Sequence, residues 1–293
     1  MLKKKYDTGT AYAMLLPMVG LLTVFIMIPF VYAIVVSFYD WSAYKESKFV
    51  GMLNYKIVLN DIHFFNAIKV GLKFTLIVVP TQMVLAFLLA HVIRNLRGFA
   101  AGFVKTAVYI PTIIAGILAA AIFSFIYNYD GGVANYLIGL FGLEKIAWLA
   151  EVKTALFSMA IPGIWLGFGI MSLIMLAGIL DIPESYYEAA DLEGAGSLAK
   201  MIHITIPLLK NISLYLFVTG TIGAIQQWEL PLIMTNGAPV DKTLTPNLYI
   251  INHFRNDPTM GSTIASALLL FVVLGSISAV IFKLINSDKA VDG

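Results

Sequence analysis

Long uninterrupted runs of hydrophobic residues dominate the chain. Six of them reach the roughly 20 residues that a helix needs to cross the hydrocarbon core of a bilayer. These runs lie at 11–38, 70–93, 106–128, 154–180, 208–228 and 261–285. Their residues do not alternate in polarity as the strands of a membrane barrel would; positions 268–274, for example, read LLLFVVL. The pattern predicts an all-α integral membrane fold with six transmembrane helices, and we take 1–293 as a single transmembrane domain.

The positive charges between the runs indicate an orientation. Lysines occupy positions 3–5 before the first run, and Arg94, Arg97 and Lys105 lie between the second and third. Cytoplasmic loops carry an excess of Lys and Arg, so both segments are expected in the cytoplasm. The loop after the first run also carries lysines, at positions 45, 48, 56 and 69, so the charge bias is modest. Six spans would place both termini and the segment 181–207 on the cytoplasmic side.

Composition narrows the function classes. Hydrophobic residues make up 59% of the 293 positions and charged residues 12%, against about a quarter charged in a typical soluble domain. The bilayer is therefore an expected partner. The net charge of +2 and the lack of a basic patch give no indication of nucleic acid binding. There is no cysteine, and the four histidines, at 63, 91, 203 and 253, show no metal-ligand spacing, so no metal site is predicted.

The segment 181–207 has the features of a short helical hairpin. Pro183 and Glu184 suit the first turn of a helix, which we expect over 184–193. Gly194 and Gly196 offer positive φ angles to end it. A second short helix is expected over 198–203, before the chain returns to the membrane at Pro207.

The first of these helices could enter a groove on a partner. Ala189 and Ala190 give it a narrow face, Tyr186, Tyr187 and Leu192 supply apolar area, and acidic residues keep the rest soluble. The alternative is an ordinary connection that happens to be helical.

The residues of this hairpin resemble a known motif. Glu188-Ala189-Ala190, with Gly194 six positions after the glutamate and Pro207 farther on, is similar to the EAA loop of binding-protein-dependent ABC importer permeases. Glu193 stands where that family usually has Asp, and Ile206 where it usually has Leu. The resemblance implies that this loop couples the membrane helices to an ATPase subunit. The implied coupling residues are Tyr187, Glu188, Ala189, Ala190, Glu193, Gly194 and Pro207.

Other segments resemble the carbohydrate-uptake branch of these permeases, of the MalF/UgpA type. They are 49–55 and 129–135 in two expected outer loops, and the turn 235–239, where Ala238 replaces a usual glycine. The resemblance implies import of a sugar or oligosaccharide across a bacterial or archaeal cytoplasmic membrane by alternating access. It also implies a second permease subunit, giving a heterodimer, together with two ATPase subunits and an extracellular solute-binding protein. The chain has no phosphate-binding loop of the type G-x-x-x-x-G-K-[ST]. It is therefore not expected to be an enzyme or to bind a cofactor itself. The resemblance implies that ATP and Mg bind to the partner ATPase.

Polar and small residues within the runs are candidates for the substrate path. Gly220, Ala224, Gln227 and Trp228 recur at helical spacing, where glycine and alanine would leave space and the amide and indole could contact a sugar. Further candidates are Gly167, Phe168, Tyr127 and Asn128. Small residues in membrane helices also serve helix packing, and Trp and Tyr also anchor spans at the interface.

Three alternatives remain open. A permease of the same type could carry a polyol or glycerol phosphate, and a phosphate would call for arginines in the path. An ion-coupled secondary carrier would bury an acid or base at mid-membrane, whereas Lys73 and Lys283 lie near span ends. A non-transporting scaffold would have a solid core.

Overall fold

The computed structural model describes residues 8–42, 46–257 and 259–285. Lysines 3–5 and Lys45, on which part of the expected orientation rests, lie outside these residues. The chain divides into two compact units. The first comprises Met1–Asp61 and Asn252–Phe271, and the second comprises Ile62–Ile251 and Val272–Gly293.

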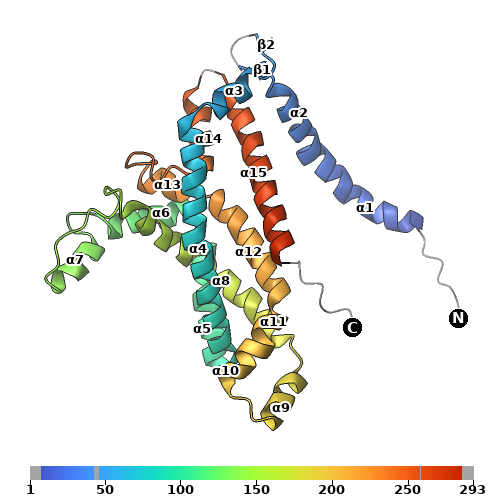
Figure 1. The fold of residues 1–293 in the computed structure, drawn as a ribbon, viewed down its shortest axis with the longest axis vertical. Helices are drawn as coiled ribbons and strands as arrows, with labels where there is room; N and C mark the ends of the chain where they lie inside the picture. Colours follow the sequence, from blue (N-terminus) through green and yellow to red (C-terminus); the bar gives the residue numbers. More distant parts are fainter. Residues whose placement is uncertain (1–7, 43–45, 258, 286–293) are drawn as a thin grey trace. The chain divides into compact units, whose positions relative to one another are not determined.

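The first unit begins with a long apolar helix. It consists of α1 (Thr8–Leu22), a π-helical turn η1 (Thr23–Met27) and α2 (Ile28–Val36). Only 6% of its most apolar window is buried. The expected first span, 11–38, therefore corresponds to one continuous helical segment of membrane-crossing length (Figure 1).

A short hairpin follows this helix in the first unit. Strands β1 (Tyr39–Asp40) and β2 (Lys48–Phe49) pair antiparallel, and α3 (Leu53–Leu59) follows them. The buried Asn54 amide donates to the carbonyls of Ser37 at 2.7 Å and Tyr39 at 2.9 Å, so α3 is tied to the end of the long helix.

The second unit contains most of the helices. In chain order they are α4 (Ile62–Arg94), α5 (Gly98–Ile113), α6 (Gly116–Ile126), α7 (Val133–Leu140), α8 (Ala155–Leu180), α9 (Glu184–Leu192), α10 (Ser197–Lys200), the π-helix η2 (Met201–Thr205), α11 (Ile206–Leu208), α12 (Lys210–Ile225) and α13 (Glu229–Met234). Two further helices, α14 (Pro246–Asn256) and α15 (Gly261–Ile285), have residues in both units.

Within the described residues, four helices are long and apolar enough to cross a membrane, and six if each bent pair of helices counts as one span. The all-α membrane fold is confirmed on that count. The spans expected at 154–180 and 261–285 correspond closely to α8 and α15. The span expected at 70–93 is the longer helix α4, which begins at Ile62 and extends through polar residues beyond the apolar run.

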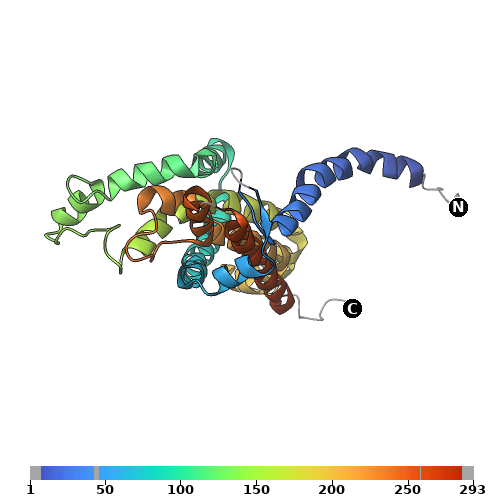
Figure 2. The same cartoon turned by 90° about the horizontal axis from the view of Figure 1, so that it is seen from above.

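The span expected over 106–128 is not one straight helix. It is replaced by α5 and α6, which are bent by 95° at a break. Pro111 removes a backbone donor near the end of α5, and Ile114 and Ala115 adopt extended conformations. As a result α6 and α7 lie to one side of α4 and α8 in both views (Figures 1 and 2).

The span expected over 208–228 is also broken. The helical segment 197–208 meets the segment 210–234 at an angle of 65°, and α12 itself ends at Ile225. Gln227 and Trp228 therefore lie after the helix rather than within it.

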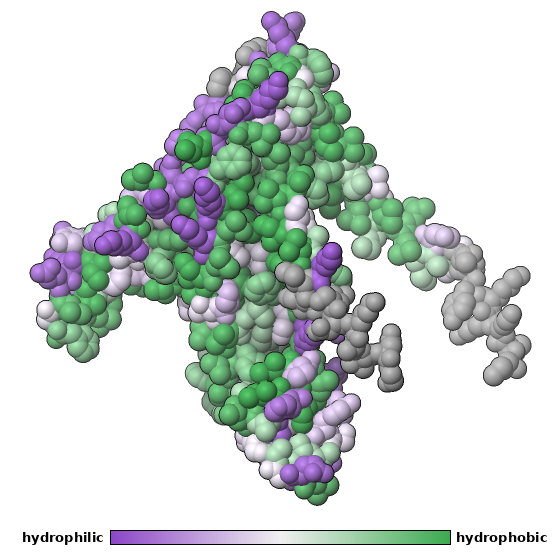
Figure 3. Space-filling view, viewed as in Figure 1, coloured by the Kyte–Doolittle hydropathy of each residue, from purple (hydrophilic) through white to green (hydrophobic). Residues whose placement is uncertain are grey.

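The core of the second unit is the contact between α4 and α8. Alanines at 86 and 90 are completely buried and allow α8 to approach closely, where Met175 and Ile179 pack against them. Farther along, Phe74 packs against Met159 and Gly163. Hydrophobic side chains also cover much of the visible surface (Figure 3), as expected for helices surrounded by lipid.

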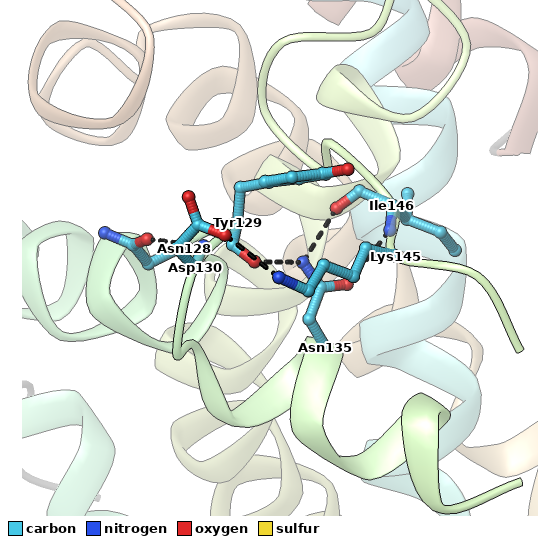
Figure 4. Close-up of polar contacts among 6 residues, drawn as sticks. All are labelled: Asn128, Tyr129, Asp130, Asn135, Lys145 and Ile146. Carbon is cyan, nitrogen blue, oxygen red and sulfur yellow. Dashed lines mark hydrogen bonds and ion pairs between the residues drawn. The ribbon is translucent and has the colours of Figure 1, made fainter. Parts of the chain in front are cut away.

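A polar network orders the connection between α6 and α8 (Figure 4). Asn135, only 5% exposed, donates to the carbonyls of Tyr129 and Ile146 and accepts from the Ile146 amide. At its edge Lys145 Nζ lies 2.9 Å from Asp130 Oδ1, and this hydrogen bond raises the pKa of Lys145. The connection is thus held by its own side chains.

Candidate functional site

The helix α9 stands at the end of the second unit where α4 and α8 finish (Figure 1). Pro183 occupies its N-cap with φ −56°, and Glu184 places a carboxylate in the first turn. The helix ends at Leu192, and Gly194 takes the expected left-handed conformation with φ +75°. Gly196 does not: its φ is −69° and it serves as the N-cap of α10, because a single left-handed residue already reverses the chain.

Two ion pairs hold α9 against its neighbours. Arg94 Nη2, at the end of α4, lies 3.3 Å from Glu184 Oε2. Lys200 Nζ, at the end of α10, lies 2.6 Å from Asp191 Oδ1. Both carboxylates are mostly exposed, so each pair contributes at most about 1 kcal/mol. The ion pairs mainly hold the two ends of α9 in position and add little to its stability.

Tyr187 fixes the middle of the helix from its inner face. Its side chain is only 6% exposed, and its hydroxyl lies 3.0 Å from Thr205 Oγ1 in η2, which is itself buried. The Arg94 guanidinium sits 4.2 Å from the centre of the Tyr187 ring. Tyr187 was expected to supply apolar area to a partner; the structure instead buries it within the chain, where it seats α9.

The outer face of α9 presents the remaining residues of the motif. Glu188 and Ala189 are exposed, and Ala190 is half-buried. Leu192, with 91% of its surface exposed, and Tyr186, with 53%, flank them. Glu193, Gly194 and Pro207 are exposed as well. Large apolar side chains this accessible on a short charged helix are typical of a contact surface.

Behind α9 lies a polar cavity of about 440 Å³. It lies beside the contacts that join α9 to the end of α4. Its lining includes His91, Arg94, Arg97, Tyr187 and Lys200.

A second cavity, of about 230 Å³, lies between α4, α8 and α12. Four of the predicted path residues line it: Gly167, Gly220, Ala224 and Gln227. Among its lining residues, all within the described part of the chain, none is charged. The lining therefore offers no partner for a charged group.

Gln82 is the polar side chain of this cavity that the sequence analysis missed. It is 5% exposed, and its Nε2 donates to the carbonyl of Gly163 at 2.9 Å. A Cβ at Gly167 would overlap the Gln82 amide, so the glycine is required for this contact. The available signal was an amide within the apolar run 70–93, because buried polar groups in spans are usually functional or paired.

Gln227 has a structural bond in addition to its place at the cavity. Its Oε1 accepts from the backbone amides of Trp228 at 2.9 Å and Glu229 at 3.1 Å, so it caps the start of α13. The Thr245 hydroxyl donates to its carbonyl at 2.6 Å. The side-chain oxygen of Gln227 therefore already accepts two hydrogen bonds from the backbone. Trp228 is not among the residues that line the cavity.

The other predicted path residues lie elsewhere. Tyr127 is buried and its ring packs 5.8 Å from that of Trp148. The Asn128 side chain accepts from the Asp130 amide in the loop of Figure 4. Phe168 is half-buried on α8 and outside the cavity lining. Contact of any of these residues with a substrate stays a prediction.

No group of three or more His, Cys, Asp or Glu side chains in the described ranges is placed to hold a metal ion.

Several known proteins are similar to this chain in sequence or in fold. The trehalose/maltose transport system permease protein MalF of Thermococcus litoralis is 30% identical over 284 residues, covering 96% of this chain and 95% of that protein. The lactose transport system permease protein LacF of Rhizobium radiobacter is 30% identical and covers 93% of each chain. A chain of a bacterial ABC transporter for import of the acidic polysaccharide alginate superposes with a TM-score of 0.81, at 21% identity and 96% coverage of both chains.

Residues 82–290, which include α8, α9 and most of the residues that line the second cavity, match one protein family. That match covers more than half of the sequence. The chain belongs to the family of binding-protein-dependent transport system inner membrane components.

Proposed function

We propose that this chain is one permease subunit of an ABC importer for a sugar or oligosaccharide. The observation that carries the substrate class is that full-length relatives are named for trehalose and maltose and for lactose. The uncharged cavity between α4, α8 and α12 fits such a neutral, hydroxyl-rich solute. A phosphorylated solute would call for cationic side chains there, and none lines it within the described chain.

The exposed face of α9 is proposed to dock in a cleft of a separate ATPase subunit. Glu188, Ala189 and Leu192 would form the contact, because they are the accessible part of a helix seated from behind by Tyr187. Binding of ATP and Mg by the ATPase would then move α9, and with it α8. In this proposal α9 would face the cytoplasm, and an even number of spans would put both termini there as well.

Alternating access would follow from two arrangements of the helices around the second cavity. Each must prefer a different ligand: the ATP-bound ATPase on one side, and the loaded solute-binding protein on the other. A second permease chain would complete the passage, since this cavity alone is small for a sugar. The cavity of about 230 Å³ is below the usual 300–1,000 Å³ of ligand pockets.

The experiment tests docking and coupling together. The tagged full chain is purified from membranes of its own host, and the accompanying chains are identified by mass spectrometry. We expect a second permease and an ATPase carrying a phosphate-binding loop. Glu188→Arg should remove the ATPase while the second permease remains.

The matched control is Glu144→Arg, the same charge reversal at an exposed glutamate in the connection before α8. It should leave the assembly intact. In proteoliposomes, the wild-type complex should hydrolyse ATP faster when the binding protein carries a sugar. An ATPase that stays bound to the Glu188→Arg variant with full sugar stimulation would overturn the docking proposal, and stimulation by no neutral sugar would overturn the substrate class.

A further inference from the structure

A groove with four lysines lies at the other end of α4 and α8 from α9. Its volume is about 710 Å³. Lys69 and Lys73 come from α4, Lys153 precedes α8, and Lys242 comes from the loop before α14. All four are exposed, and among the described residues none forms an ion pair. The residues of the described ranges that line the groove include no acidic side chain.

Hydrogen bonds within the chain hold the segments that carry the four lysines close together. Asn66 Nδ2 donates to the carbonyl of Asp241 at 2.9 Å and thereby fixes the loop that carries Lys242 against α4. The nearby carboxylate of Asp241 is bonded to His63, 2.6 Å away. Lys69 and Lys73 face the same side of α4, four residues apart, where like charges repel. A cluster of this kind is stabilised by an anion from outside the chain.

Depth along α4 places the groove at a membrane edge. Lys73 lies 21 positions before Arg94, which corresponds to about 31 Å of helix. That is close to the thickness of the hydrocarbon core, about 30 Å. If Arg94 lies at one surface, Lys73 lies at the other, and Leu76 and Ile77 lie about one turn inside the hydrocarbon.

The side chains that line the groove change from charged to apolar at the same depth. Leu76 is 70% exposed and Phe157 is 60% exposed, and both follow a lysine by three or four positions toward the membrane interior. Ile77 and Leu156 extend this apolar surface on the membrane side of Lys73 and Lys153, whereas Val70 is buried between Lys69 and Lys73. A ligand that fits this order has an anionic head and apolar chains beneath it.

We propose that this groove binds the headgroup of an anionic phospholipid, such as phosphatidylglycerol, in the leaflet opposite α9. The four ammonium groups bind the phosphate, and the acyl chains lie along Leu76 and Phe157. An acidic saccharide or free phosphate shares the anionic group but has no acyl chains, so it leaves this apolar wall uncovered. The proposal depends on α4 and α8 crossing the bilayer and does not depend on the identity of the transported solute.

The test is lipid retention by the purified full chain, measured by native mass spectrometry. The probes are phosphatidylglycerol and phosphatidylcholine with identical acyl chains. The variant replaces Lys69, Lys73, Lys153 and Lys242 with glutamine. The control replaces four other lysines, at 48, 56, 105 and 283, in the same way. Thermal stability of each variant in detergent verifies folding.

We expect the wild type and the control to retain phosphatidylglycerol in preference to phosphatidylcholine. The groove variant should lose at least about tenfold in that preference, since a lysine near an anionic surface is worth about 1 kcal/mol. Leu76→Ser with Phe157→Ser should weaken binding of the diacyl lipid and leave binding of glycerol phosphate unchanged.

Three results would overturn the proposal. The first is equal retention by the groove variant and the wild type. The second is displacement of the lipid by millimolar inorganic phosphate, which would identify a free-anion site. The third is displacement by a uronate oligomer, which would identify a saccharide site. None of these results bears on whether the ATPase docks at α9.

Discussion

Replacing Tyr187 with phenylalanine removes one hydroxyl group from the inner face of α9. The ring stays, and with it the contact to Arg94 at 4.2 Å. The change therefore isolates the hydrogen bond of 3.0 Å to Thr205. Because Thr205 is 1% exposed, its hydroxyl loses this partner without gaining water. We expect a cost of about 1–2 kcal/mol for the seated position of α9.

Replacing Tyr187 with alanine should cost more. Tyr187→Ala removes a ring that is 6% exposed, which costs about 3–5 kcal/mol for a buried aromatic side chain. It also removes the cation–π contact with Arg94, worth about 0.5–2 kcal/mol. The two ion pairs at the ends of α9 remain, but exposed pairs cannot compensate a loss of this size.

Hydrogen–deuterium exchange of the α9 backbone measures these costs directly. Local opening exposes the amides, and each 1.4 kcal/mol of lost stability speeds their exchange about tenfold. Tyr187→Phe should therefore accelerate exchange in α9 by about five- to thirtyfold. Tyr187→Ala should accelerate it more than about a hundredfold, until the limit set by the isolated helix.

The chain offers a neighbouring control. Tyr186 is 53% exposed, so Tyr186→Phe and Tyr186→Ala should each change exchange less than about threefold. Combining Tyr187→Phe with Thr205→Val should cost less than the sum of the two single changes, because both partners of one bond are then removed. Equal exchange in the two phenylalanine variants would refute the inward seating of Tyr187.

Two further predictions concern packing in the second unit. Gly167→Ala should break the Gln82 contact with α8 and lower the free energy of unfolding by about 1–3 kcal/mol. Gly223→Ala, at a position of the same cavity with open space, should be neutral or stabilising. Thermal denaturation in detergent compares the two variants, and similar losses of stability would contradict the role of the Gln82 contact. Asn135→Ala should leave buried backbone groups of the α6–α8 connection without partners and make this segment a site of limited proteolysis. Asn128→Ala, which loses one exposed hydrogen bond, should not. Equal cleavage of the two variants would show that the Asn135 network is dispensable.

The parts of the fold that the sequence predicted best are those governed by composition alone. The helices α8 and α15 follow the limits of their apolar runs, because a polar or charged residue at each end marks where lipid contact stops. The helix α9 was also expected from local signals: a proline and an acidic residue at its start and a glycine at its end.

The breaks within spans were not predictable in the same way. The run 106–128 stays apolar through Ile114 and Ala115, so hydropathy does not record the 95° bend between α5 and α6. Pro111 is compatible with a straight, kinked or broken helix, and the packing of α13 against α6 lies outside any local pattern. Long-range packing therefore decides this geometry.

The orientation of individual side chains was equally hidden. Tyr186 and Tyr187 are adjacent and chemically identical, and the partners that turn Tyr187 inward, Thr205 and Arg94, are distant in the sequence. Gln82 was missed because its partner carbonyl is 81 positions away. Gln227 was expected to offer its whole amide to a solute, whereas the turn into α13 uses its oxygen.

The continuity of α8 has a mechanical consequence. Residues Gly163 and Gly167, against which Gln82 packs, lie on the same helix whose last turn leads through three residues into α9. The one proline inside α8, Pro162, comes just before this stretch, so the helix is least stiff beyond the cavity rather than between the cavity and α9. A tilt applied at α9 would be transmitted as the swing of an arm about 26 Å long, from 163 to 180, with its pivot at the proline.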